Sequence, residues 1–378
     1  MKKNKKIKTI AIFSGYSLPH LGGIERFVDN LSKKFIENGY KTIIVSSNYN
    51  NSFETITKSN NLIDMRIPIY KLFSKRYPII KHNKKLIEVK RELDSNDISA
   101  IIVNTRFHLT SLFGAKYGRK HKIPVYLIEH GSSHLSINNK FLDFLGAIYE
   151  HVLTSYLKKF VNYYYGVSQD ACDWQKHFKI NSDGIWYNSI NRFDENIKIE
   201  KSSENIIILY AGRILKQKGV EDLIEAFLQV KNNYKNSELI IAGDGDFLPI
   251  LRKKYCDKRI KFMGKINFDE LKKLYSKSNI FVHPSHYPEG LPTSILEAGL
   301  MKCAIIATPN GGTSYFINDT NGIIIKSMDD LVKALEKCLE NPDYCRKIGE
   351  NMQKTVINNF TWDKTVKKII NDINQNSN

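Results

Sequence analysis

The segment HYPEGLPTSILEAGLM, residues 286–301, places two acids where they could bind a hydroxyl-rich ligand. Glu289 follows a proline in a predicted loop, and Glu297 lies eight positions later in an apolar, helix-like run. Because an unpaired carboxylate is rarely left fully buried, each acid needs a partner. Glu289 could accept hydrogen bonds from sugar hydroxyls. Glu297, about one helical turn after Thr293, could accept both hydroxyls of a ribose, as acids do in dinucleotide sites. The alternative is a helix-cap acid and a surface glutamate.

The residues between these acids favour a tight turn. Gly290 and Pro292 allow it, and the backbone N–H groups from Leu291 through Thr293 to Ser294 could then point at a ligand.

A pair of cations follows an earlier predicted strand. Arg213 comes directly after NIIILYAG, and Lys218 lies five residues later, just before a helix expected to begin near Glu221. Two cations and a helix N-terminus together suit a diphosphate. The alternative is a pair of exposed surface charges.

Two stretches of the chain repeat the order of elements that would position these residues. The first is KTIAIFSG, a glycine loop, an amphipathic helix ending at Gly39, and KTIIVSS. The second is NIIILYAG, a helix, and ELIIAGDG. Short Ile/Val-rich strands alternating with helices predict parallel sheets covered on both faces. Further strands are expected at residues 98–104, 124–131, 161–168, 260–264, 280–285, 303–309 and 322–326.

We therefore expect an α/β protein with two Rossmann-like, doubly wound domains facing a central cleft. The first spans residues 1–195 and the second residues 196–359, with the boundary in the polar stretch 191–204. The amphipathic tail predicts a closing helix within residues 360–378 that returns to the first domain. Ligands of open α/β sheets bind at the carboxyl ends of strands, so transfer of a group from a nucleotide carrier is the natural reaction class.

Composition excludes several other classes of protein. The 378 residues are 42% apolar and 25% charged, without low-complexity bias, as in a globular protein. No apolar run approaches the roughly 18 residues of a membrane span. The basic, apolar start favours a first strand over a signal peptide, because its apolar part is short and no cleavage pattern follows. The five scattered cysteines lack a C-x-x-C pair, which argues against a disulfide scaffold and a zinc site. We expect a cytoplasmic protein.

The net charge of +18 is unevenly distributed. Residues 1–197 hold 30 basic against 17 acidic residues, and the remainder holds 27 against 22. The densest stretch, residues 71–91, has eight Lys and Arg side chains among apolar ones. Such a stretch could dock on an anionic membrane surface. A solvated basic surface is the alternative, and nucleic acid fits less well because no nucleic-acid motif accompanies the charge.

The motifs together resemble the family 4 glycosyltransferases, retaining enzymes of the GT-B fold. The likeness rests on EGLPTSILEAG, which holds Glu289 and Glu297, and on GRILKQKG, which holds Arg213 and Lys218. It extends over almost the whole chain through GGIERFVDNLSKKFIENGYKTIIVS, YYYGVS, WYNSIN, GDGDF and FTW, in the family's order and spacing.

The resemblance implies roles for particular residues. Glu289 is implied to grip the donor sugar and Glu297 the ribose, while Arg213 and Lys218 hold the diphosphate leaving group. Gly22 and Gly23 match the loop whose backbone approaches the phosphates, with a plain helix start as the alternative. His130, in LIEHGSS, matches the family's cleft histidine near the reacting sugar, although a lone histidine is more often structural.

Three segments depart from the family or invite another interpretation. Asn188-Ser189-Ile190-Asn191 stands where the family often has Asn-Gly-Ile-Asp. Thr313-Ser314-Tyr315 replaces the usual acid of the glycine-pair segment, which would alter donor contacts. Asp244 and Asp246 could be mistaken for a metal-binding pair, but directly after a strand they are expected to form a turn.

The resemblance thus implies a metal-independent retaining transferase that needs no cofactor and uses a nucleoside-diphosphate sugar, UDP rather than GDP. The expected acceptor is a glycan, in particular a lipid-linked intermediate of a bacterial surface polysaccharide, reached from the inner face of the cell membrane. The alternative is a catalytically inert GT-B subunit that binds a partner transferase or a glycosylated protein. The four charged residues argue against it, because an inert subunit does not need them.

Overall fold

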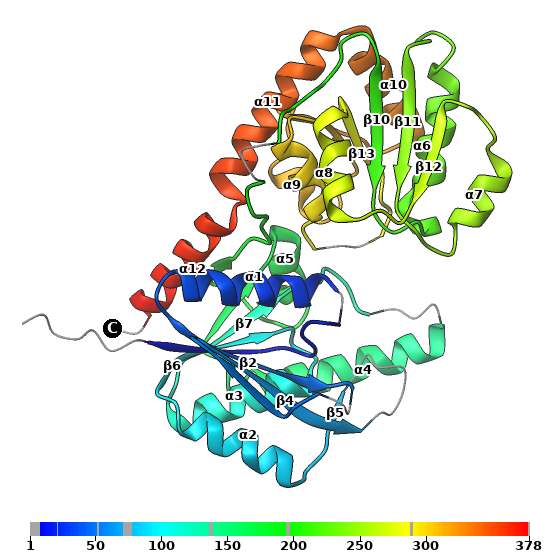
Figure 1. Ribbon diagram of the computed structural model, residues 1–378. Helices are drawn as coiled ribbons and strands as arrows, with labels where there is room; N and C mark the ends of the chain where they lie inside the picture. Colours follow the sequence, from blue (N-terminus) through cyan, green and yellow to red (C-terminus); the bar gives the residue numbers. More distant parts are fainter. Residues whose placement is uncertain are drawn as a thin grey trace, which may run out of the picture. The chain divides into compact units, whose positions relative to one another are not determined.

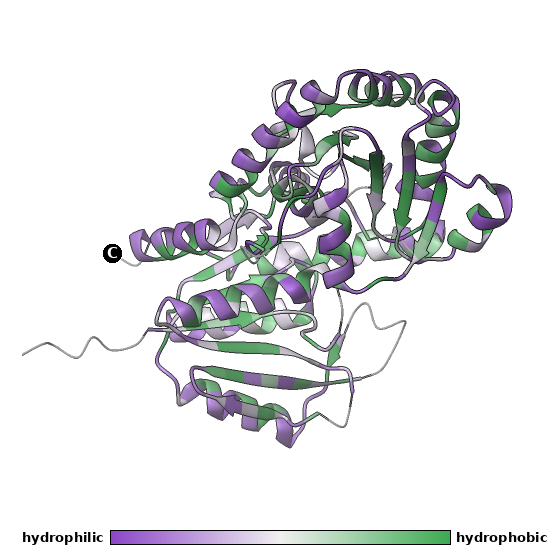
Figure 2. Ribbon diagram, turned by 45° about the horizontal axis from the view of Figure 1, so that its top comes forward, coloured by the Kyte–Doolittle hydropathy of each residue, from purple (hydrophilic) through white to green (hydrophobic). Residues whose placement is uncertain are grey.

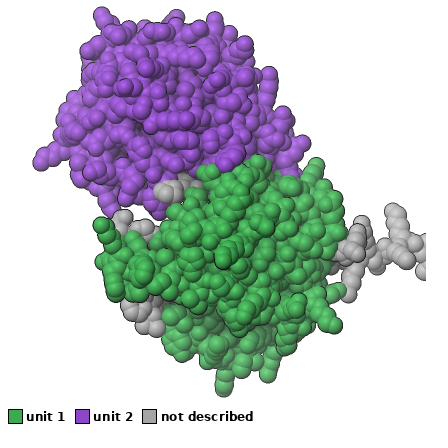
Figure 3. All heavy atoms as spheres, turned by 180° about the vertical axis from the view of Figure 1, so that it is seen from behind, with its two compact units in different colours: residues 1–188, 365–378 green, residues 189–364 purple. Residues whose placement is uncertain are grey.

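The computed structural model describes residues 8–20, 22–50, 53–70, 78–135, 139–193, 197–287 and 290–376. The chain forms two compact units, residues 1–188 with 365–378 and residues 189–364, coloured separately in Figure 3. The first unit ends before the polar stretch where we expected the domain boundary. The two segments that connect the units pair with each other, because the amide of Ile190 donates to the carbonyl of Phe360 at 3.0 Å.

Unit 1 is built on a mixed sheet with the strand order β3-β4-β2-β1-β6-β7-β8-β9, and β5 pairs with β4. Helix α1 lies on one face of this sheet, and α2 and α3 lie on the other (Figure 1). The elements are β1 (Thr9–Phe13), α1 (Gly23–Glu37), β2 (Lys41–Asn48), β3 (Ile56–Ser59), β4 (Leu62–Tyr70), β5 (Ile79–Ile80), α2 (Lys84–Asp94), β6 (Ile98–Asn104), α3 (Leu109–His121), β7 (Val125–Glu129), α4 (Lys140–Leu157), β8 (Tyr163–Gly166), α5 (Gln169–Lys176), β9 (Gly184–Ile185) and α12 (Trp362–Gln375).

The expectation of a purely parallel first sheet was wrong at one edge. Strands β3 and β5 each pair antiparallel with β4. Asn60, at the turn between β3 and β4, has a positive φ of 38°, a conformation that asparagine tolerates better than most residues. The hairpin therefore depends on turn chemistry and not on the strand–helix alternation that we followed along the chain.

Unit 2 is a parallel sheet with the order β12-β11-β10-β13-β14-β15. Strands β10, β11, β13 and β14 are mostly apolar and buried, whereas β12 alternates buried and more exposed residues. Each expected strand of this half is present. The elements are β10 (Ile206–Ala211), the 3-10 helix η1 (Lys216–Lys218), α6 (Val220–Val230), β11 (Ser237–Ala242), α7 (Leu248–Lys254), β12 (Ile260–Gly264), α8 (Phe268–Lys277), β13 (Ile280–His283), α9 (Thr293–Leu300), β14 (Ala304–Ala307), the 3-10 helix η2 (Thr313–Tyr315), β15 (Gly322–Ile324), α10 (Met328–Glu340) and α11 (Pro342–Asn359).

The distribution of apolar residues explains both units. In Figure 2 the strands of the sheets are mostly green, whereas the surrounding helices carry purple and green residues. Strands covered on two faces must be apolar throughout, and a covering helix needs only one apolar side. All five cysteines are free thiols, as their spacing predicts.

The closing helix α12 belongs to unit 1 from Thr365 onward. The indole Nε1 of Trp186 donates to Asp372 at 2.7 Å, and Lys8 donates to Asn374 at 2.9 Å. Trp186 is fully buried and stacks on Tyr165 with the ring centres 3.8 Å apart. These contacts fasten the end of the chain to the first unit.

Candidate functional site

In unit 2, Lys218 lies against the loop that follows β13. Its side chain is only 6% exposed, and its ammonium nitrogen lies 5.3 Å from the centre of the Tyr287 ring. The amide of His286 donates to the carbonyl of Gln217 at 2.9 Å, so the loops after β10 and β13 are directly bonded. Burial removes the surface-charge alternative for Lys218. Glu289, two residues after Tyr287, lies outside the described residues, and its role stays a prediction.

Gly219 permits this close approach of the two loops. It has a φ of 68°, and a Cβ at this position would lie 2.0 Å from the carbonyl oxygen of Pro284. Any other residue would be strained and would push the loops apart. The glycine that ends η1 therefore fixes the position of Lys218 relative to the β13 loop.

Arg213 stands at the other end of the same loop and is exposed. The structure therefore does not remove the surface-charge alternative for this residue. Its backbone is well fixed, because the hydroxyl of Tyr210 donates to the Arg213 carbonyl at 2.9 Å. The amide of Ile214 donates to the carbonyl of Asp244 at 2.9 Å, which joins this loop to the Gly-Asp-Gly turn after β11.

The aspartates of that turn behave as expected for turn formers. The amide of Gly245 donates to the Asp244 carboxylate at 2.9 Å, and Asp244 and Asp246 are both exposed. Neither belongs to the cluster of possible metal ligands found in the described part of the chain.

The first turn of α6 carries its own acids. Glu221 pairs with Lys254 at 2.7 Å, and this hydrogen bond lowers the pKa of Glu221. Asp222 pairs with His286 at 2.7 Å. Part of the positive potential of this helix N-terminus is thus already used by side chains, which places more of the expected anion binding on Arg213 and Lys218.

Glu297 lies in α9, within one helical turn of Thr293, and is partly buried. The hydroxyl of Tyr275, in α8, donates to its Oε2 at 3.1 Å. Tyr275 is fully buried, and burial followed by the charge of Glu297 raises its pKa well above the usual value. The tyrosine therefore remains protonated and acts as a fixed donor that orients the carboxylate. No spacing in the sequence pointed to it.

The turn between the two acids is supported by the glycine pair after β14. Leu291 and Pro292 are buried. A Cβ at Gly311, where φ is 67°, would lie 2.1 Å from the carbonyl oxygen of Gly290. Thr313, in the segment where the family resemblance implies an acid, donates its hydroxyl to the carbonyl of Thr308 at 2.6 Å. Its side chain thus holds the loop itself together.

In unit 1, Gly22 caps α1 and Gly23 is its first residue. A Cβ at Gly22 would lie 2.2 Å from Oε2 of Glu25, whereas a Cβ at Gly23 would meet nothing within 4 Å. Glu25 is buried in the first turn and accepts a hydrogen bond from Nδ1 of His20 at 3.1 Å if that nitrogen is protonated. A side chain at position 22 would have to displace the flexible carboxylate of Glu25, and no neighbouring atom restricts position 23.

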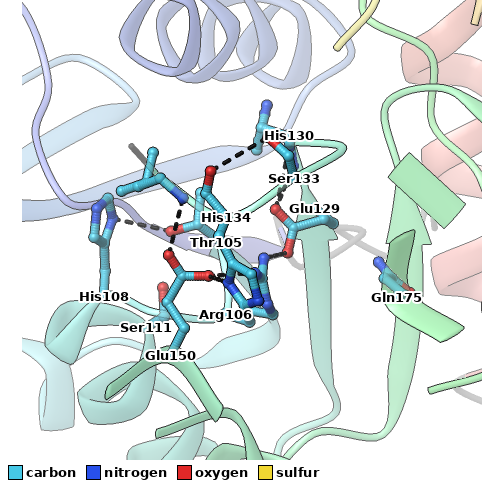
Figure 4. A network of polar contacts seen from close by, with 12 residues as sticks. Thr105, Arg106, His108, Ser111, Glu129, His130, Ser133, His134, Glu150 and Gln175 are labelled. Carbon is cyan, nitrogen blue, oxygen red and sulfur yellow. Dashed lines mark hydrogen bonds and ion pairs between the residues drawn. The ribbon is translucent and has the colours of Figure 1, made fainter. Parts of the chain in front are cut away.

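His130 (Figure 4) stands at the carboxyl end of β7. Its Nε2 lies 2.8 Å from Oδ1 of Asn104, the last residue of β6. The Phe27 ring of α1 meets the imidazole edge-on, with centres 4.8 Å apart. The structure therefore brings the helix that begins at Gly23 into contact, within unit 1, with residues 130–135 after β7, called the histidine loop below.

The surrounding bonds assign the tautomer of His130. The amide nitrogen of Asn104 donates to the carbonyl of Phe13 at 3.1 Å, so its oxygen faces the histidine. An oxygen acceptor requires a proton on Nε2, which leaves Nδ1 as an acceptor in the neutral ring. Burial, followed by the charge of His108, lowers the pKa of His130 to about 3. The ring is therefore neutral and available for hydrogen bonding at physiological pH.

A buried ionic network holds the histidine loop in place. Arg106 donates to Glu129 at 2.5 Å and to Glu150 at 2.6 Å, and all three side chains are at most 1% exposed (Figure 4). The other oxygen of Glu129 accepts the amides of His130 at 3.1 Å and Gly131 at 3.2 Å. Sequence reasoning missed this network because its members are far apart in the chain.

The sequence of this chain matches two family models and is similar to known glycosyltransferases. Residues 21–191 match the model described as Glycosyltransferase Family 4, and residues 191–355 match Glycosyl transferases group 1. An uncharacterised glycosyltransferase of Methanocaldococcus jannaschii is 30% identical over 96% of this chain and 97% of its own length. The alpha-monoglucosyldiacylglycerol synthase of Acholeplasma laidlawii is 29% identical over 41% of this chain and 40% of its own.

Two solved structures share the fold of the whole chain. Sucrose-phosphate synthase of Thermosynechococcus elongatus superposes with a TM-score of 0.76 at 18% identity, covering 97% of this chain and 98% of its own. HepE of Anabaena, in complex with UDP, gives 0.75 at 17% identity, covering 98% and 100%. The two Rossmann-like sheets therefore have the GT-B fold.

The chain belongs to the family 4 glycosyltransferases, because the two family models together match residues 21–355 and a glycosyltransferase 30% identical to it spans nearly all of both chains. The resemblance expected from EGLPTSILEAG and GRILKQKG is confirmed.

Proposed function

We propose that the protein is a retaining glycosyltransferase that moves a hexosyl or N-acetylhexosaminyl group from a UDP-sugar to a hydroxyl of a glycan acceptor. The observation that carries this proposal is the meeting of two loops in unit 2. One brings buried Lys218 against Tyr287, and the other leads into the helix of Glu297, whose carboxylate Tyr275 orients. A cation for the diphosphate and an acid for the ribose are what a nucleotide donor requires.

In the proposed reaction, the bond between the anomeric carbon and the diphosphate oxygen breaks. The acceptor oxygen bonds to the same face of that carbon, and the proton of the acceptor hydroxyl passes to the departing diphosphate. Lys218 and Arg213 stabilise the charge that develops on the leaving group, in place of a divalent cation. Glu289 binds the donor sugar, and neutral His130 offers Nδ1 as an acceptor to a sugar hydroxyl.

UDP is favoured over GDP because a neighbour with the same fold, HepE, is described as a complex with UDP. The acceptor is proposed to be a lipid-linked glycan of a bacterial surface polysaccharide. A relative whose name specifies a diacylglycerol product supports a lipid acceptor, although its similarity covers less than half of this chain.

An apolar stripe on α4 supports a membrane-facing role for unit 1. The helix exposes large apolar side chains at intervals of three or four residues, among them Phe141 at 68%, Phe144 at 63% and Val152 at 66%. Lysines stand at both ends, Lys140 at the first position and Lys159 just beyond the last. An apolar face with flanking cations is typical of a helix that lies in an anionic lipid interface.

Neighbouring elements extend this surface. Lys116 of α3 places its ammonium 4.7 Å from the ring centre of Tyr156 in α4. The same lysine borders a largely apolar cavity of about 450 Å³ lined by residues of β5, α2 and α3. Lys84 and Lys85, from the basic stretch 71–91, are exposed at the start of α2. Residues 71–77 of that stretch lie outside the described residues.

We propose that this face docks on anionic phospholipid at the inner face of the cell membrane. The described part of the chain contains no helix that is long and apolar enough to cross a membrane.

The test of the donor site is a nucleotide screen with the full chain. A ligand at a hundred times its dissociation constant stabilises the fold by about 2.7 kcal/mol, so UDP should raise the melting temperature measurably and more than GDP or ADP do. UDP-sugars are then assayed for transfer to a soluble glycan. Failure of every nucleotide to stabilise the protein would support the alternative, an inert GT-B subunit that binds a partner transferase or a glycosylated protein.

A further inference from the structure

Three histidines from separate elements of unit 1 form a cluster that the donor chemistry does not use. His134 follows β7, His151 lies in α4 and His177 ends α5. One ring nitrogen from each lies within 4.8 Å of the other two. The Nε2 atoms of His151 and His177 are 3.1 Å apart. Metal–nitrogen bonds of about 2.0–2.1 Å at tetrahedral angles separate two ligand nitrogens by about 3.3 Å.

The third histidine is oriented as a metal ligand usually is. Nδ1 of His134 lies 2.8 Å from the carboxylate of Glu150, which is fully buried (Figure 4). A histidine that binds a metal commonly donates its other ring N–H to a carboxylate, which fixes the tautomer and the ring orientation. With Nδ1 engaged by Glu150, Nε2 is the nitrogen that His134 can offer to a cation.

The charge beneath the cluster independently favours a cation. Glu129 and Glu150 are both fully buried, and the guanidinium of Arg106 contacts both. Two carboxylates and one guanidinium carry a net formal charge of −1 beneath His134. Uncompensated buried charge is costly, and a divalent cation on the far side of His134 would offset it.

The aromatic surroundings hold two of the imidazoles in place. His177 stacks on Trp174 with ring centres 4.7 Å apart and an interplanar angle of 7°. The ring of Phe178 lies 4.7 Å from that of His151. The three ligand nitrogens lie within 4.8 Å of one another, against about 3.3 Å in a tetrahedral site, so a shift of about 1.5 Å or less brings them to a bonding separation.

We propose that His134, His151 and His177 bind one divalent transition-metal ion, Zn²⁺ by the preference for tetrahedral nitrogen ligands, with Glu150 as the carboxylate behind His134. The ion would cross-link the segment after β7 to α4 and α5. It would thereby restrain the loop that also carries His130, four residues before His134. The site is structural and separate from the donor residues, so this inference does not rest on the proposed function.

The test uses the full chain without a histidine tag, stripped of metal by dialysis. Zn²⁺ is titrated calorimetrically, and Co²⁺ is titrated while visible absorption is followed, because tetrahedral Co²⁺ absorbs strongly there. We expect one equivalent to bind. At a hundred times the dissociation constant, Zn²⁺ should raise the melting temperature by about 3 °C.

Two double variants separate this site from adventitious binding. His151→Gln/His177→Gln removes two exposed ligands, so folding should survive while affinity falls at least about 100-fold and the melting shift disappears. His82→Gln/His121→Gln removes two histidines outside the cluster and should bind Zn²⁺ as the parent does. Equal binding by the cluster variant and the parent would overturn the proposal, and so would the absence of saturable binding to the parent.

Discussion

Replacing Tyr275 with phenylalanine tests whether the carboxylate of Glu297 is positioned for a ribose. The ring of Tyr275 is fully buried and would keep its packing, so the substitution removes only the hydroxyl that donates to Glu297 at 3.1 Å. A hydrogen bond to a charged group contributes about 1.5–3 kcal/mol. Because Glu297 is partly exposed, water can replace part of this bond, and the lower figure applies.

A loss of about 1.5 kcal/mol corresponds to roughly a tenfold weaker donor complex. We therefore expect Tyr275→Phe to raise the KM for the UDP-sugar about tenfold, with kcat little changed, because the ribose contact exists before and during reaction. Steady-state kinetics at saturating acceptor and calorimetric binding of UDP measure the two effects.

Tyr234→Phe is the matched control, since its hydroxyl donates to Glu340 at 2.8 Å elsewhere in unit 2. It should leave donor binding unchanged. Glu297→Gln is made in parallel. An unaltered KM in Tyr275→Phe, together with weakened binding in Glu297→Gln, would refute the positioning role and keep the ribose contact. Unaltered binding in both variants would refute the ribose assignment itself.

Four further outcomes are expected. Lys218→Ala should lower kcat by about 10²–10³-fold, since losing one donor to a developing anion costs about 2.7–4 kcal/mol. Lys216 is exposed in the same short helix, so the kcat of Lys216→Ala should stay within twofold of that of the parent. EDTA should leave the initial rate of the His151→Gln/His177→Gln variant, which lacks the proposed zinc site, nearly intact, because Arg213 and Lys218 replace a divalent ion at the diphosphate. Loss of this activity, restored by Mn²⁺, would contradict this. The pKa of His130 is lowered to about 3, whereas a histidine of the unfolded chain has a pKa near 6.5, so the unfolded chain binds the extra proton. The free energy of unfolding should therefore fall as the pH drops from about 6.5 toward 3, and denaturant titrations of the parent and His130→Asn should differ in this slope by up to about 1.4 kcal/mol per pH unit. Equal slopes in the two proteins would count against burial of this ring. Phe144→Ser/Val152→Ser should weaken binding to phosphatidylglycerol vesicles without lowering activity on a soluble acceptor. Ile250→Ser, which removes an exposed apolar side chain of unit 2, should bind vesicles as the parent does. Undiminished vesicle binding by the double variant would refute the docking of α4 on the membrane.

The sequence by itself determined the two-sheet architecture. Strand β6, residues 98–104, is a mostly apolar and almost fully buried run, and the observed strand has the expected bounds. Burial on both faces imposes that pattern locally, so it can be read without knowing the partners. The motifs around Lys218 and Glu297 identified the family for a related reason, because each lies within one loop and the helix that follows it.

Only the tertiary structure decided which residues support those motifs. Tyr275 reaches Glu297 from another helix, and Arg106 joins two glutamates that belong to different elements. The histidines of the proposed metal site are 17 and 26 positions apart, a spacing that no local motif predicts. Such contacts depend on which elements the fold packs together, and the energy of each arises from burial that the order of residues does not display.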